Sequence, residues 1–209
     1  MAIGACFLWA SVNVGEKYLV SGRIKNPFVY LCLAGCLNIF LLPIFFLTKI
    51  DIPNWPTLGL LFLTAIFYLG GSVFYVSALK KEEVSRINIL WQLIPIFNFT
   101  FVYILFRETL THNQTWAFII LVVGGILASI HWKTNQWRWS KALLIMFWAC
   151  LLYSGYAVTF DYVSRIFDPL SGWLWVNIFI MLLAPVFLMS VKNRKDFEQD
   201  REGCDMLIG

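Results

Sequence analysis

The feature that most constrains this chain is a series of seven apolar runs separated by short polar breaks. A helix that crosses the hydrocarbon core of a bilayer needs about 20 apolar residues, and each run has roughly that length. The predicted spans are residues 2–21, 28–48, 57–79, 87–106, 115–133, 140–163 and 170–191. The sequence therefore predicts an all-α integral membrane protein with about seven transmembrane helices, in which short connections make successive helices antiparallel neighbours.

Composition excludes a water-soluble fold and several classes of function. Hydrophobic residues make up 60% of the 209 residues and charged residues 13%, whereas soluble domains are about 45–50% apolar and about 25% charged. The chain has neither a phosphate-binding P-loop nor a Gly-rich dinucleotide loop, so any transport would use a gradient or be passive. Cys32 and Cys36 share a helical face without His or acidic neighbours. We therefore expect no metal, no cofactor and no nucleic-acid partner.

One short polar string occurs twice. Residues 22–27 read "GRIKNP" and residues 164–169 read "SRIFDP", so the shared pattern recurs at a spacing of 142 residues. Pro43 and Pro185 match at the same spacing, and "ACFLWASVNVGEKY" before the first string resembles "ACLLYSGYAVTFDY" before the second. An ordered series of matches across two helices and one loop indicates an internal duplication.

The two copies are predicted to have opposite orientations. Five spans separate them, and an odd number of crossings inverts the second copy, as in many secondary transporters. Alternate connections hold three or more Lys and Arg residues, whereas the intervening ones hold one each, Lys49, Arg107 and Arg165. Because cytoplasmic loops collect Lys and Arg, this bias predicts an N-terminus outside the cell and a multi-pass protein of the plasma membrane.

The duplication also predicts the domain organisation. Residues 1–133 form a first five-helix repeat, residues 140–191 form a partial second repeat of two helices, and residues 192–209 form a charged, disordered tail. Three helices of the second repeat have no counterpart in the chain. We expect either a fragment that lacks C-terminal helices or a chain that completes itself with a partner, for example as a homodimer.

The middle of the chain resembles the EamA-type branch of the drug/metabolite transporter superfamily. The stretch "ALKKEEVSRINILWQLIPIFNFTFVYILFRETLTHNQTWAFIILVVGGILAS" has the features of that family, namely Ala78-Leu79, Ser85, Pro95, Glu108-Thr109-Leu110-Thr111, Gln114 and Gly124-Gly125. Arg107 stands where the family usually has Gly. The resemblance implies a ten-helix plan of two five-helix repeats that moves small organic solutes through a cavity between them. It also implies two cytoplasmic termini, contrary to the charge bias.

Two helices carry polar side chains on one face. The polar positions recur at i, i+4 and i+7, a spacing that places side chains on one side of a helix. They are Trp9, Asn13 and Glu16 in the first span, and Asn88, Gln92 and Pro95, flanked by Trp91, in the fourth. Two polar stripes with aromatic neighbours favour a substrate cavity, with Pro95 as a helix break. Hydrogen bonds between helices are the alternative, and Tyr75 either faces the cavity or packs.

Glu16 is the candidate for proton coupling. An ionisable group at membrane depth is a functional hypothesis by default, and a carboxylate there could exchange a proton for a substrate. The alternative is that Glu16 and Lys17 extend to the membrane interface as an adjacent pair. Glu108 is expected to stop a helix, and Gly124 and Gly125 are expected to let helices approach closely.

These features predict a secondary-active transporter. It would move a small metabolite or amphipathic organic solute across the lipid bilayer by alternating access between inverted repeats. A truncated, transport-inactive scaffold, or a half-transporter that needs a partner chain, is the alternative. An enzyme is not expected, because the sequence shows no His/Asp or Cys/His cluster at one membrane face.

Overall fold

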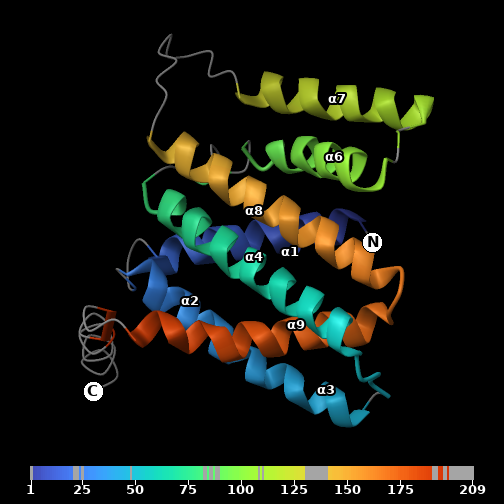
Figure 1. Ribbon diagram of the computed structural model, residues 1–209. Coiled ribbons are helices and arrows are strands. Elements are labelled where there is room, and N and C mark those ends of the chain that lie inside the picture. Colours follow the sequence, from blue (N-terminus) through green and yellow to red (C-terminus); the bar gives the residue numbers. More distant parts are fainter. Residues whose placement is uncertain are drawn as a thin grey trace.

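A computed structural model describes residues 2–20, 24, 26–47, 49–81, 84, 87, 90–107, 109, 111–129, 141–189, 193–194 and 197. The secondary structure of these residues is helical (Figure 1). The α-helices are α1 (Ala2–Tyr18), α2 (Pro27–Cys36), α3 (Leu42–Leu47), α4 (Trp55–Leu79), α6 (Leu93–Phe106), α7 (His112–Ser129), α8 (Lys141–Ser164) and α9 (Pro169–Leu183). Two 3₁₀ segments, η2 (Leu37–Leu41) and η3 (Ala184–Met189), continue α2 and α9.

Three of these helices begin with the same local chemistry. Asn26, Asn54 and Asp168 are the N-cap residues of α2, α4 and α9, and each side chain accepts a hydrogen bond from a backbone N–H in the first turn. A proline follows at the first or second helical position, where its missing N–H costs nothing. Both copies of the repeated string, "GRIKNP" and "SRIFDP", therefore end by capping a helix.

The second predicted span is one apolar run but three segments of structure. The run 28–48 is divided among α2, η2 and α3. Pro43, the second residue of α3, has no N–H to give to the carbonyl of residue 39, and proline removes one bond of the α-helical ladder. The neighbouring Leu42 N–H bonds to Ile39, three residues back, as in a 3₁₀ turn. Pro185 has a similar place as the second residue of η3.

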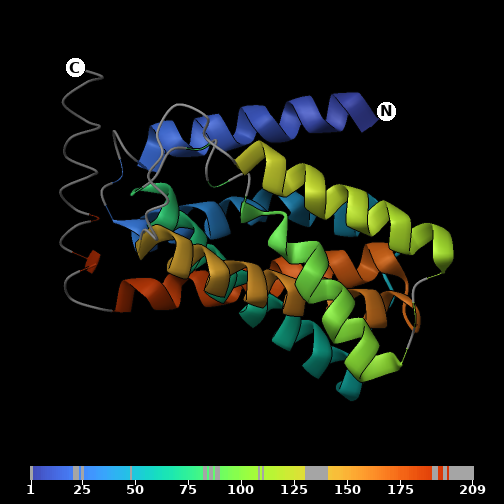
Figure 2. The same ribbon diagram turned by 90° about the horizontal axis from the view of Figure 1, so that it is seen from above.

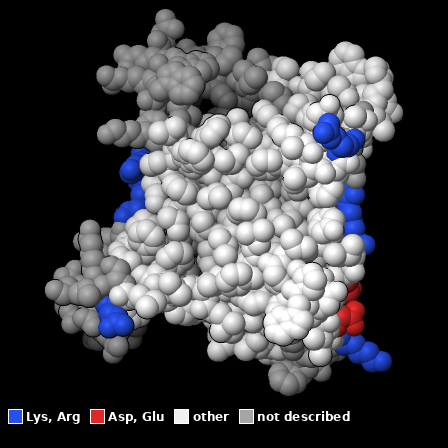
Figure 3. Space-filling model, viewed as in Figure 1, with Lys and Arg blue, Asp and Glu red and all other residues white. Residues whose placement is uncertain are grey.

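Four segments within the described residues are long and apolar enough to cross a membrane. They are Pro27–Ile44, Trp55–Leu79, Leu144–Ser164 and Pro169–Met189, and Leu93–Phe106 is a shorter apolar helix. Figure 3 shows an uncharged band over the middle of this face, with charged residues at its two lateral edges. The helices cross this band from edge to edge in Figure 1, as expected for a protein that spans a bilayer.

The fourth predicted span is interrupted near its start. Within 87–106, residues 87 and 90 are helical, residues 91 and 92 form a turn, and α6 begins at Leu93. Pro95, in the first turn of α6, has no N–H to give to the carbonyl of Trp91, four residues back. That carbonyl accepts a hydrogen bond from the Ile94 N–H instead, at 3.0 Å. The helical ladder is therefore interrupted directly before Pro95.

Helix α4 is the centre of the bundle, and α8 packs along it (Figure 1). Helix α6 packs on α8, α9 packs on α4, and α2 packs on η3, while α7 lies outermost beside α6 (Figures 1 and 2). Glycines allow the close approach of α4 and α8: a Cβ atom at Gly71 would lie 3.1 Å from the ring of Tyr153, and one at Gly155 would lie 3.2 Å from the ring of Phe67.

Candidate functional site

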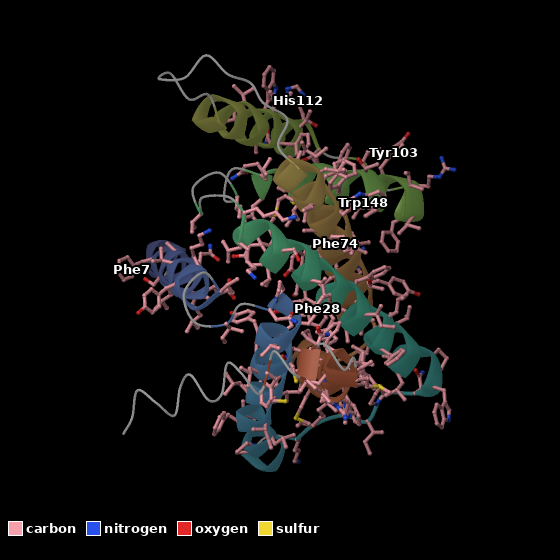
Figure 4. The ribbon with its side chains drawn as sticks, turned by 90° about the vertical axis from the view of Figure 1, so that its left-hand side faces the viewer. Phe7, Phe28, Phe74, Tyr103, His112 and Trp148 are labelled. Carbon is pink, nitrogen blue, oxygen red and sulfur yellow. The ribbon has the colours of Figure 1, made fainter. Side chains whose placement is uncertain are left out.

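Helix α1 turns polar side chains towards the bundle and apolar side chains away from it. Asn13 is only 2% exposed and Glu16 and Lys17 are half-buried, whereas Phe7 and Leu8 are 73% and 67% exposed. Figure 4 shows Phe7 directed away from α4. In a bilayer the outer side chains face lipid, which is as apolar as a protein core. The buried polar edge of α1 therefore needs hydrogen-bond partners.

Glu16 receives such partners from two other helices. Its Oε1 atom accepts a hydrogen bond from the Tyr30 hydroxyl of α2 at 2.9 Å, and its Oε2 atom accepts one from the Tyr75 hydroxyl of α4 at 3.0 Å. The Tyr75 hydroxyl also lies 3.2 Å from Oδ1 of Asn13. Three helices thus converge on one carboxylate.

The chemistry of this cluster is that of a hydrogen-bond acceptor with spare capacity. A carboxylate can accept about four hydrogen bonds, and the two tyrosines occupy one lone pair on each oxygen of Glu16. Because Tyr75 carries a single hydroxyl proton, it shares that proton between Glu16 and Asn13. The remaining lone pairs of Glu16 therefore let the cluster hold a polar group that donates further hydrogen bonds.

Lys17 has a different partner from its neighbour in the sequence. Its Nζ atom donates a hydrogen bond to the carbonyl oxygen of Leu79, the last residue of α4. The last carbonyls of a helix have no partner within it, and a cation there interacts favourably with the helix dipole. Lys17 thus joins α1 to the C-terminal end of α4.

A series of aromatic rings continues from Tyr75 along the α4–α8 interface. The rings belong to residues of α4, of α8 and of the turn before α6. The centroid distances are 5.2 Å for Tyr75–Trp91, 5.1 Å for Trp91–Tyr153, 5.8 Å for Tyr153–Tyr68 and 5.4 Å for Tyr68–Tyr156. The Tyr153 hydroxyl also lies 2.8 Å from Oγ of Ser72. The polar cluster is therefore bordered by a wall of aromatic faces.

The structure brings together four of the residues named from the sequence, Asn13, Glu16, Tyr75 and Trp91. Gln92 is half-buried in the turn that precedes α6, next to Trp91 in the chain. The backbone of Trp9 belongs to α1, but its side chain lies outside the description. Asn88 and Glu108 lie outside the described residues altogether.

Gln114, singled out through the family motif, has a structural role at the start of α7. The Thr111 N–H donates to Oε1 of Gln114 at 2.9 Å, and the Gln114 N–H donates to Oγ1 of Thr111 at 3.4 Å. This reciprocal pair is a capping box. Gly124 and Gly125 lie in the second half of α7, and their surroundings are outside the description.

Sequence reasoning missed Tyr30, Ser72 and Tyr153. Tyr30 lies in an apolar run and repeats no spacing of the Asn13–Glu16 stripe. Its part in the cluster follows from the placement of α2 beside α1, which periodicity does not show. A signal was available for Ser72, because Tyr68, Ser72 and Tyr75 recur at i, i+4 and i+7 of one helix.

The fold and the polar cluster together indicate the class of protein: a multi-pass helical membrane protein with a polar cluster inside its bundle. Comparison with known families matches residues 1–130, more than half of the chain, to the EamA-like transporter family. The chain belongs to this family of membrane transporters, which confirms the resemblance seen in the sequence. The members are transporters rather than enzymes. No curated protein and no solved structure gives a significant match.

Proposed function

We propose that this protein is a secondary-active transporter that moves a small metabolite or amphipathic organic solute by alternating access between inverted repeats. The observation that carries the proposal is the Glu16 carboxylate, held by the hydroxyls of Tyr30 and Tyr75 inside an apolar helix bundle. Ionisable side chains are costly at membrane depth and mark substrate or ion pathways. Glu16 is the acidic residue that the described part of α1 directs into the bundle.

The surroundings of Glu16 suit an organic solute. Sites for small molecules combine apolar and aromatic walls with a few convergent polar groups. Here Glu16 and Asn13 supply the polar groups, and the rings of Tyr75, Trp91 and Tyr153 supply the wall. A carboxylate can also gain and lose a proton, so a proton gradient is our proposed driving force.

Two observations support the repeat part of the proposal. The family match ends at residue 130, close to the predicted end of the first repeat at residue 133. The two repeated strings also have the same local role, because Asn26 and Asp168 each cap a helix that starts with proline.

Uptake into proteoliposomes tests the proposal. The full chain is reconstituted with an imposed pH gradient and supplied in turn with amino acids, nucleosides and cationic dyes. We expect gradient-driven uptake of at least one class, reduced about tenfold or more by Glu16→Gln, since that change removes the charge of the carboxylate that Tyr30 and Tyr75 hold. The matched control is Asp161→Asn, which removes an exposed carboxylate paired with Arg165 at 2.9 Å and should leave uptake unchanged.

Two results would contradict the proposal in different ways. Absence of uptake for all three classes, with helical content intact by circular dichroism, would favour the transport-inactive scaffold. Uptake that is unchanged in Glu16→Gln would leave a transporter but would remove Glu16 from its mechanism.

A further inference from the structure

Helix α1 is joined to the bundle in a different way from the helices around it. The extensive helix pairs of the described residues are α4 with α8, α6 with α8, α2 with η3 and α4 with α9. Helix α1 instead meets the bundle along one edge, through side chains of Asn13, Glu16 and Lys17. In Figure 4, α1 lies to one side of α4, at the margin of the molecule.

The N-terminal part of α1 has free space around its described residues. An added Cβ atom at Gly4 would meet nothing within 4 Å. Phe7 and Leu8 are exposed, and the Ser11 hydroxyl bonds within the helix, to the carbonyl of Phe7. The described side chains of this part therefore hold no close packing against the described bundle that a movement of α1 would break.

The C-terminal end of α1 is anchored. Val20 is 1% exposed and belongs to the buried cluster that includes Leu31, Val76 and Leu79. Leu19 and Val20 are in π-helical conformation, and the Ile24 N–H bonds to the carbonyl of Leu19, five residues back, at 2.8 Å. Such π-helical turns loosen the regular ladder and are common sites of helix bending.

Between the free part and the anchor lies a set of exchangeable bonds, which we call the latch: the side chains of Asn13, Glu16 and Lys17 with their partners Tyr30, Tyr75 and the Leu79 carbonyl. Hydrogen bonds between membrane helices are individually weak. A proton bound at Glu16 weakens both tyrosine bonds, because a neutral carboxyl group accepts hydrogen bonds less strongly than a carboxylate.

We propose that α1 is a hinged strap. It pivots at the π-helical turn of Leu19–Val20 and is held closed over the Glu16 site by the latch. Opening of the strap would expose Glu16, Tyr30 and Tyr75 on the side that α1 covers. The inference rests on the proposed function only in taking Glu16 as the solute site, and the motion itself can be measured without any substrate.

Distance measurements between spin labels test the proposal. Ketone-bearing amino acids that accept a spin label replace Phe7 on α1 and Trp148 on α8, so the native cysteines stay in place; both positions are exposed. A second pair, Trp55 on α4 and Trp148 on α8, reports on the bundle itself. The full chain is studied by double electron–electron resonance in lipid nanodiscs, with and without the variant Tyr30→Phe/Tyr75→Phe.

The double variant removes two hydroxyls of the latch and no ring. Two interhelical bonds of ordinary strength correspond to roughly a tenfold shift in population. We expect a longer-distance component in the 7–148 pair that grows about tenfold, while the 55–148 pair stays unchanged. Tyr153→Phe is the matched control, because it removes a hydroxyl bonded to Ser72 between α4 and α8, away from the latch.

Each other outcome overturns the strap. An unchanged 7–148 distribution in the double variant shows that the latch does not hold α1. Equal broadening in both pairs, or in the control variant, shows that the whole bundle loosens. A strap that opens in a protein without uptake would refute the proposed function alone, whereas uptake through a protein with a rigid α1 would refute the strap alone.

Discussion

The α4–α8 pair and the edge of α1 show two ways of joining helices in a membrane. Between α4 and α8, rings fill the space beside glycines: Tyr153 lies against Gly71, and Phe67 lies against Gly155. At the edge of α1, three polar side chains bond to tyrosines and to a backbone carbonyl. Lipid removes the hydrophobic drive for helix association, so dispersion contacts decide rigidity and exchangeable bonds permit motion.

The largest expected effect comes from placing the same substitution, Gly to Leu, at the α4–α8 contact and on α1. Gly71→Leu should lower the free energy of unfolding by about 1–3 kcal/mol, since overpacking displaces neighbouring rings and Tyr153 lies in the way. Gly15→Leu has open space around it and should be neutral or slightly stabilising, because leucine favours helix more than glycine does. Equilibrium unfolding in detergent micelles measures both.

An equal cost for Gly71→Leu and Gly15→Leu would break the comparison. It would mean that α1 packs as closely on its neighbours as α8 packs on α4.

The peripheral helix α7 offers a second contrast, because its start is stabilised locally. Thr111→Ala removes the hydroxyl of the capping box and should cost about 1 kcal/mol. Thr111→Ser keeps an oxygen at the same place and is the matched control. A similar loss in both variants, measured by thermal unfolding, would assign the effect to packing of the methyl group and not to the cap.

A smaller effect is expected for the hydrogen bond between the rigid helices. A double-mutant cycle of Ser72→Ala and Tyr153→Phe should give a coupling energy of about 0.6 kcal/mol, the average for interhelical bonds in a membrane. The hydroxyls lie 2.8 Å apart. A coupling near zero would show that ring packing alone joins α4 to α8, which would sharpen the contrast with α1.

The smallest effect concerns the two repeated strings. Hydrogen bonds from Ser171 lower the pKa of Asp168, the N-cap of α9, below its usual value of 3.8, whereas Asn26, the N-cap of α2, does not titrate. A lowered pKa stabilises the folded state fully above pH 3.8, and this contribution is lost as the pH falls through the lower pKa of the folded protein.

Acid unfolding measures this difference. Asp168→Asn keeps a capping side chain, but the amide does not titrate. The variant should therefore lose slightly less stability than the unchanged protein as the pH falls below 3.8. An identical acid profile for both proteins would show that the Asp168 carboxylate adds nothing beyond the neutral cap.

Much of the fold follows from local sequence, and less of the site does. The apolar runs predict to within two residues where α2, α4 and α9 begin, and the Asn-Pro and Asp-Pro breaks mark the starts of α2 and α9, because caps act within one turn. Pro95 was named as a helix break, but the position of the turn at Trp91–Gln92 was not predicted, since hydrophobicity continues through it. Asn13 and Glu16 were named because they share a helix face, but periodicity does not show what faces them.

The sequence by itself determined that this chain is a helical membrane protein of the EamA-like family. The lengths of the apolar runs, the helix caps and the family motif each depend on residues that are close together in the sequence. Only the tertiary structure decided that Tyr30 and Tyr75 bond to Glu16. It also decided that aromatic rings fill the α4–α8 interface, whereas polar side chains attach α1 to the bundle. The physical reason is that lipid accepts any apolar face, so hydrophobic pattern alone does not specify which helix lies beside which; close fit and polar partners do.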